Sequence, residues 1–197
     1  MGEEIKSARE IAMEKVEKLG EVTEEERLGW KYAPEGEKLA ARYLKQNLNM
    51  LSELGKFEDK AKKYVIKGTQ EVLIRNLELP RNDFLRKKNR RAMEGIKLLK
   101  NNKVSVENVF SKVRRIFDHY VEQGEQQRKQ AYESLKVDVE ARLQQALKQQ
   151  IGTLANVRID VERQPQFQEE WRRVLSQMDA QYISLLNEYK QELMTIT

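Results

Sequence analysis

The fold is decided by a stretch with almost no helix-breaking residues, residues 105–151, which read SVENVFSKVRRIFDHYVEQGEQQRKQAYESLKVDVEARLQQALKQQI. Because it contains no proline and one glycine, Gly124, it predicts a single α-helix about 70 Å long. Its first part carries a broad apolar stripe, which is typical of a helix packed against a globular body. From Tyr132 the stripe narrows, and the mean step between apolar residues is about 3.67, which indicates a nearly straight pair of helices.

Helical periodicity and helix start signals occupy most of the remaining chain. Apolar residues recur every three or four positions over residues 3–19, and Thr23 and Glu26 form a capping box that begins a second helix. Pro34 and Gly36 are expected to interrupt that helix. Further helices are expected over residues 39–54, from 57 to Pro80, from Asn82 to about Lys100, from Ser105, and from Pro165 onwards.

These signals predict an all-α protein, because nine glycines and three prolines leave room for few turns in 197 residues. We expect an elongated helical body at residues 1–122 and a long helical hairpin, resembling a coiled-coil arm, at residues 123–197. The one exception is the alternation of Val157, Ile159 and Val161 with polar residues, which predicts a short β segment at residues 157–161.

The narrow stripe of the long helix predicts self-association. A final helix of about 28 residues spans about 42 Å and cannot cover the whole stripe. Either the helices before residue 100 or the same helix of a second copy could cover the remainder, and the narrowness of the stripe favours the second copy. This predicts a homo-oligomer, with a dimer favoured. The expected seam consists of Tyr132, Leu135, Val139, Leu143, Leu147 and Ile151 on the long helix and Trp171, Met178 and Tyr182 on the final helix.

The positive charge of the chain is concentrated in one window. The formal net charge is +5, whereas residues 81–103 alone contain nine basic and two acidic residues. On the expected helix these basic side chains share one face, so they could neutralise phosphates of RNA or DNA. They could equally form a solvated surface or bind an acidic protein segment. The candidate nucleic-acid contacts are Arg86, Lys87, Arg90, Arg91 and Lys97.

The sequence lacks the residues that most enzyme sites and metal sites require. It has no cysteine and one histidine, His119, with Glu122 one turn away, which is an incomplete ligand set. It also lacks a glycine-rich phosphate loop and a nucleophile elbow. We therefore expect a non-enzymatic protein with no cofactor and no metal.

Three stretches carry a family resemblance: residues 7–12 (SAREIA), 34–43 (PEGEKLAARY) and 164–171 (QPQFQEEW). They resemble an uncharacterised bacterial helical family, and this resemblance implies no activity, ligand or site residue. The N-terminal residues do not form a secretory signal and no long apolar run is present, so a soluble cytoplasmic protein without membrane contact is expected. The sequence predicts a helical interaction or scaffold protein, with nucleic-acid backbone binding as the alternative.

Overall fold

The computed structural model describes residues 23–46, 48–151 and 160–196, with the side chains of Gln150 and Ile151 outside this description. The described residues are almost entirely helical and contain no strand, which confirms the all-α class. They form two compact units, an N-terminal unit ending at Leu73 and a C-terminal unit beginning at Ile74. The predicted domain boundary at residues 122–123 falls inside a continuous helix of the C-terminal unit. The helix expected over residues 3–19 lies outside the described residues.

The N-terminal unit is built from α2 (Glu24–Lys45), α3 (Met50–Leu54) and most of α4 (Asp59–Arg75). Thr23 and Glu26 form the predicted capping box at the start of α2. A helix expected over residues 39–54 is instead divided between Lys45 and Met50. There the chain leaves the helical path, and the side chain of Asn49 accepts a hydrogen bond from the backbone amide of Ser52 (3.2 Å) to begin α3.

The expected interruption of α2 at Pro34 and Gly36 is wrong, because the helix continues through both residues. Pro34 removes only one helical hydrogen-bond donor, at an exposed position. Gly36 is buried where α2 crosses α4: a Cβ atom at this position would lie 2.1 Å from the backbone oxygen of Val65. Gly68 of α4 makes the reciprocal approach, since its Cβ atom would lie 2.3 Å from the oxygen of Ala33. The two glycines therefore allow a close helix crossing and do not form a turn.

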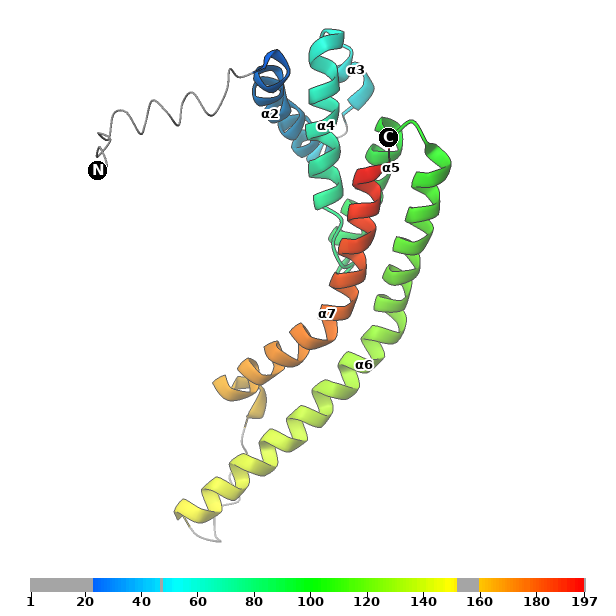
Figure 1. The fold of residues 1–197 in the computed structure, drawn as a ribbon. Coiled ribbons are helices and arrows are strands. Elements are labelled where there is room, and N and C mark those ends of the chain that lie inside the picture. The colour runs from blue at the N-terminus through cyan, green and yellow to red at the C-terminus, as the bar shows by residue number, and fades with distance from the viewer. Residues whose placement is uncertain (1–22, 47, 152–159, 197) are drawn as a thin grey trace, which may run out of the picture. The chain divides into compact units, whose positions relative to one another are not determined.

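The C-terminal unit contains α5 (Asp83–Leu99), α6 (Lys103–Ile151), the 3₁₀ turn η1 (Val161–Arg163) and α7 (Pro165–Thr195). The 49 residues of α6 confirm the single long helix, and α7 runs back along it (Figure 1). Asn82 caps α5 as expected, with its side chain 2.9 Å from the amide of Leu85. Asn102, and not Ser105, caps α6, because Asn102 Oδ1 accepts the hydrogen bond of the Ser105 amide (3.0 Å).

Two apolar regions hold α6 in place. Its first half packs in the main core of the C-terminal unit with side chains of α5 and α7; the fully or almost fully buried members include Ile96, Val106, Val109, Phe110, Val113, Leu186 and Leu193. Farther along α6, Val139 packs with Val161 of η1 and Phe167 of α7 in a second cluster. The predicted β segment at residues 157–161 falls mostly on residues outside the described ones, and Val161 itself begins the 3₁₀ turn.

Candidate functional site

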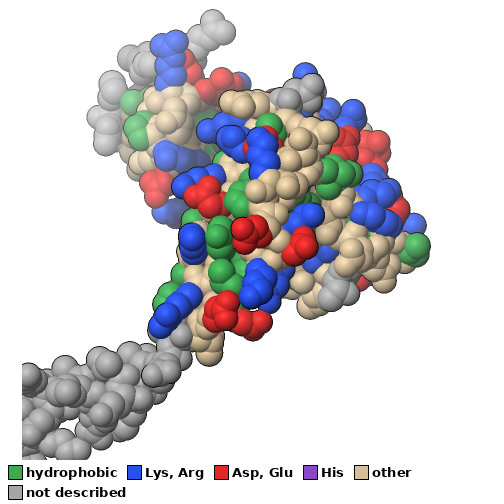
Figure 2. Space-filling model, turned by 90° about the horizontal axis from the view of Figure 1, so that it is seen from above, with side chains coloured by type: hydrophobic (Ala, Val, Ile, Leu, Met, Phe, Trp, Pro, Cys, Tyr) green, Lys and Arg blue, Asp and Glu red, His purple; other side chains and the backbone are tan. Residues whose placement is uncertain are grey.

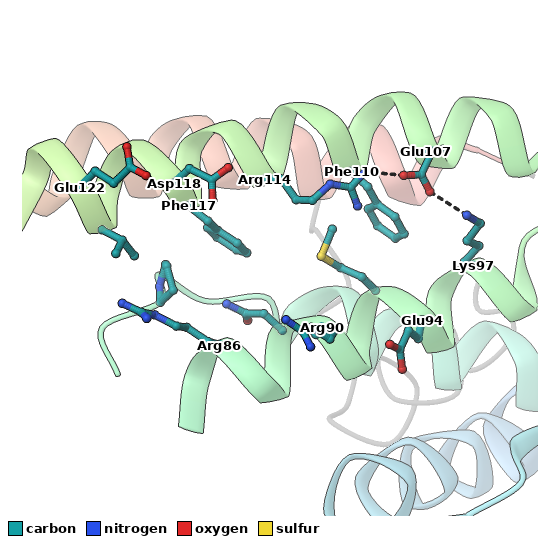
Figure 3. Close-up of a pocket in the computed structure, with 14 residues that line it drawn as sticks. Arg86, Arg90, Glu94, Lys97, Glu107, Phe110, Arg114, Phe117, Asp118 and Glu122 are labelled. Atoms are coloured by element: carbon teal, nitrogen blue, oxygen red, sulfur yellow. Dashed lines mark hydrogen bonds and ion pairs between the residues drawn. The ribbon is translucent and has the colours of Figure 1, made fainter. Parts of the chain in front are cut away.

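A groove of about 550 Å³ runs between α5 and α6 in the C-terminal unit (Figure 3). Its floor is apolar and includes Met93 of α5 and Phe110 and Phe117 of α6. Arg86 and Arg90 line it from α5, and Asp118 and Glu122 line it from α6. Glu94 of α5 and Arg114 of α6 also line the groove, so both walls carry charges of mixed sign, and neither wall is suited to binding polyanions along its whole length.

One end of this groove is closed by an ion-pair network. Glu107 of α6 accepts hydrogen bonds from Lys97 of α5 (2.8 Å) and from Arg114, about two turns farther along the same face of α6. These two donors, Lys97 first, hold the pKa of the Glu107 carboxyl below its ordinary value, because both favour the charged form. The carboxylate thus neutralises a lysine that the sequence suggested for phosphate binding.

Two of the five predicted nucleic-acid contacts, Arg86 and Lys97, are paired with acids of the same chain. Arg86 lies 3.4 Å from Asp83, and Lys97 is bonded to Glu107 as described. Outside the candidate set but within the same window, Arg81 pairs with Asp179 (2.7 Å) and Lys88 with Glu78 (2.9 Å). Arg91 is half-buried, and only Lys87 and Arg90 of the five candidates are exposed without an acidic partner among the described residues.

The surface shows the same mixing of charge. On the face drawn in Figure 2, lysine and arginine side chains alternate with aspartate and glutamate side chains, and neither kind forms a continuous field. Cations of the basic window can also have an acidic partner far away in sequence: Arg81 pairs with Asp179, 98 residues farther along the chain. A count of charges within the window could not reveal these partners.

The predicted seam on α6 is partly covered within the chain. Val139 is 2% exposed, and Tyr132, Leu135 and Leu143 pack around it together with Val161 and Phe167. The ring of Tyr132 also makes edge contacts with Phe167 (5.2 Å between centroids) and Trp171 (5.0 Å). η1 and the first turns of α7 thus supply part of the cover, Tyr132, Leu135 and Leu143 remain half-buried, and cover by a second copy stays a prediction. Leu147 is half-buried, and the Ile151 side chain lies outside the described residues.

A different apolar surface, on α7, is only partly covered: Trp171 contacts Tyr132 and Tyr182 contacts His119 of α6, whereas Leu185 is exposed. Six side chains spaced three or four residues apart form what we call the α7 strip, and each is half-buried or exposed: Trp171, Val174, Met178, Tyr182, Leu185 and Tyr189. Beside its C-terminal part, Ile116 and His119 of α6 complete a groove of about 740 Å³. Trp171, Met178 and Tyr182 were in the predicted seam, whereas Leu185, which is 42% exposed, was not.

His119, the single histidine, bonds to an aromatic side chain of α7. Its Nδ1 lies 2.8 Å from the hydroxyl of Tyr182, and the two rings are 5.7 Å apart. Within the described ranges, no group of three or more histidine, aspartate or glutamate side chains is placed to hold a metal ion. The observed role of His119 is thus a contact between α6 and α7.

A model of a family of unknown function, DUF6657, matches residues 51–195. The chain belongs to this family. The match bears out the resemblance to an uncharacterised helical family, although residues 7–12 and 34–43 lie outside the matched range. Neither a curated protein nor a solved structure matches the chain.

The DUF6657 match spans α4 to α7 and contains both grooves and the α7 strip. In the part of the chain that is described, no helix carries an apolar stretch sufficient to cross a bilayer. The family description assigns no chemistry, so the surfaces themselves must indicate what a DUF6657 protein does.

Proposed function

We propose that this chain is a non-enzymatic helical interaction protein that self-associates through the α7 strip. The observation that carries the proposal is the continuous apolar strip itself. Of the 31 residues of α7, only Phe167, Asp179, Leu186 and Leu193 are buried. Trp171 and Tyr182 of the strip also contact α6, but the exposed Leu185 and the half-buried remainder extend the apolar surface beyond what covering α6 requires.

The spacing of the strip suits another helix as the partner. Its members follow one another at steps of three and four residues from Trp171 to Tyr189, which is the spacing of a coiled-coil seam, over about 27 Å. Such a strip presents knobs to a facing helix, whereas a flat sheet or a peptide in extended conformation would not match its period.

A second copy is the partner that this surface fits best. In a two-fold pair the same strip faces itself, so apolar residues meet apolar residues without a separate complementary surface. The side chains flanking the middle of the strip on one side are Gln177 and Gln181, which are exposed and uncharged. Two copies can therefore approach there without opposing like charges.

The nucleic-acid alternative has weaker support. Ion pairs with Asp83 and Glu107 neutralise Arg86 and Lys97, and Arg90 lines a groove that also holds Glu94, Asp118 and Glu122. A binder of the phosphate backbone needs several uncompensated cations along one path. Lys87 and Arg90 alone supply few such contacts.

Molar mass in solution tests the proposal. Sedimentation velocity over a concentration series should show a species of twice 23.3 kDa for the unmodified chain. Leu185→Asp should convert it to the monomer, because a charge in an apolar seam has no partner there. Ile183→Asp is the matched control: Ile183 is 41% exposed on the same helix but about 160° away from Leu185, so this variant should remain a dimer.

Each outcome of the sedimentation experiment tests a different part of the proposal. A mass of 23.3 kDa at every concentration for the unmodified chain would refute self-association. A dimer that survives Leu185→Asp would refute the assignment of the α7 strip, and a dimer that both aspartate variants dissociate would show a general effect of charge on α7.

A further inference from the structure

A pocket of about 460 Å³, separate from the two grooves, lies on another flank of α7, and three arginines line it. Arg81 comes from the segment before α5, Arg128 from α6 and Arg172 from α7. Only one acid, Asp179, lines the same pocket. The three guanidinium groups and one carboxylate give the pocket a net charge of about +2, because arginine stays protonated at any physiological pH.

The acid in this pocket is buried and incompletely paired. Asp179 is 6% exposed, and its Oδ2 accepts a hydrogen bond from Arg81 at 2.7 Å. Its other oxygen, Oδ1, is buried without a hydrogen-bond partner in the described part of the chain. A buried carboxylate with an unsatisfied oxygen destabilises the folded state, so a role in folding does not explain why Asp179 is there. Its contact fixes the guanidinium of Arg81 at the pocket, and this suggests that Asp179 positions a ligand-binding arginine.

Contacts within the chain also hold the guanidinium of the second arginine, Arg128, in place. Arg128 donates a hydrogen bond to the backbone oxygen of Tyr120 (3.1 Å), and its guanidinium lies 4.1 Å from the centroid of the Tyr120 ring. Burial raises the pKa of Tyr120. The positive charge of Arg128 opposes this rise and the negative charge of Asp179 adds to it, so the phenol is a neutral hydroxyl at neutral pH. Two arginines are thus oriented in advance, which reduces the entropy lost on binding.

The guanidinium of the third arginine, Arg172, still has nitrogens that can bind a ligand. Arg172 is exposed, and only its Nε has a partner, the backbone oxygen of Gln168 at 3.2 Å. Its terminal nitrogens have no partner among the described residues, so they can still bind an anion. Ser176, one turn farther along α7, adds a hydroxyl to the lining.

We propose that the pocket of Arg81, Arg128 and Arg172 binds a phosphate group, either as inorganic phosphate or as the terminal phosphate of a small soluble ester. Planar guanidinium groups donate paired hydrogen bonds to tetrahedral oxyanions, and a phosphate monoester carries close to two negative charges at neutral pH. This matches the net charge of the pocket. The leucine and isoleucine side chains of its wall, Leu175 and Ile183, can contact the carbon part of an ester.

The proposal is independent of self-association. Arg172 and Met178 are separated by about 120° around α7, so the pocket and the α7 strip face different directions. Failure of one proposal therefore leaves the other standing.

Isothermal titration calorimetry at constant ionic strength tests the pocket, with inorganic phosphate and glycerol 3-phosphate as two separate probes. The unmodified chain should show saturable binding of at least one probe. Dimethyl phosphate, which has one charge and no terminal phosphate, should bind more weakly. Tighter binding of the ester would identify phosphorylated small molecules as the ligand class, and tighter binding of inorganic phosphate would identify the free ion.

Two arginine variants of α7 provide the matched comparison. Arg172→Gln should weaken binding about tenfold or more, because it removes the free terminal nitrogens of a charge-assisted contact. Arg173→Gln, which removes an exposed arginine paired with Glu169, should leave binding within about twofold. Both positions are exposed, and circular dichroism should confirm that both variants fold.

Three results would overturn the proposal. The first is the absence of saturable heat for both probes up to about 20 mM, at the weak end of biological affinity. The second is equal binding by Arg172→Gln and the unmodified chain. The third is an equal loss in both variants, which would show attraction to the overall positive charge and not to this pocket.

Discussion

The close crossing of α2 and α4 predicts that one substitution has opposite effects at two glycines of the same helix. Gly36→Ala places a Cβ atom 2.1 Å from the oxygen of Val65 and 2.8 Å from the nitrogen of Thr69. Real Cβ atoms essentially never approach within 3.0 Å, so the two helices must separate by about 0.9 Å there. Gly29→Ala is the control, because its Cβ atom would meet the ring of Tyr64 at 3.6 Å, an ordinary contact.

The magnitude follows from what the separation breaks. Forcing a group into a well-packed crossing costs about 1–3 kcal/mol. The one hydroxyl proton of Thr69 is shared between the backbone oxygens of Val65 (2.8 Å) and Gly36 (3.1 Å), so separating the helices would lose at most about 1 kcal/mol from the contact with Gly36. Alanine returns about 1 kcal/mol through its higher helix propensity. Gly36→Ala should therefore destabilise the N-terminal unit by about 1–3 kcal/mol, whereas Gly29→Ala should stabilise it by about 0.5–1 kcal/mol.

Hydrogen exchange measured by mass spectrometry in increasing urea is the appropriate assay, because a chain of two compact units does not have to unfold in one step. Peptides from α2 and α4 report on the N-terminal unit, and peptides from α6 serve as the internal reference. The reasoning also predicts that Gly36→Ala and Gly68→Ala combine with less than additive cost, since both push the same two helices apart. Equal stability of Gly36→Ala and Gly29→Ala would refute the close crossing.

Two further predictions concern the C-terminal unit. Asn89 is 2% exposed, and its side chain accepts a hydrogen bond from the backbone amide of Glu78 (3.0 Å) and donates one to the backbone oxygen of Glu78 (2.6 Å). Asn89→Ala should therefore lower the free energy of unfolding in urea by about 2–3 kcal/mol, against about 1 kcal/mol for loss of the exposed cap in Asn82→Ala. Equal costs would contradict this role of Asn89. Because the pKa of Glu107 is lowered in the folded state, its stabilising effect is present above the unfolded pKa of about 4.3 and is lost as pH falls through the lower folded value. The melting temperature of Glu107→Gln should thus fall less steeply below about pH 5 than that of the unmodified chain, and identical slopes would show that the Lys97 pair has no net effect.

Periodicity and capping chemistry were sufficient to predict most helices, because both depend on residues close together in sequence. The capping box at Thr23, the cap at Asn82 and the start of α7 at Pro165 are local features of this kind. The role of Gly36 could not be predicted from its neighbours in sequence. The property that lets glycine form turns, its missing side chain, also lets two backbones approach, and only the position of Gly68 on α4 distinguishes the two uses.

The candidate sites were harder to predict because their partners are distant in sequence. The basic window was counted correctly, yet its acidic partners Glu107 and Asp179 lie outside it. Similarly, the narrow stripe on α6 did need a cover, but the estimate considered the length of the final helix alone. The cover at Val139 comes in part from Val161, in a turn that has no helical period and therefore gave no signal.

Both surfaces that we propose as binding sites lie on α7, and α6 contributes residues to the walls of each. The apolar stripe in the first half of α6 is buried in the main core, and Val139 in its second half is buried by Val161 and Phe167. In α7, by contrast, one face meets α6 while the flanks on either side hold an apolar strip and an arginine-lined pocket. Two surfaces about 120° apart on one helix can be occupied at the same time. An effect of phosphate on the molar mass of the chain would therefore point to coupling through a shared contact, and the ring of Tyr120 is one, because it lies 4.1 Å from the guanidinium of Arg128 and 5.1 Å from the ring of Tyr182.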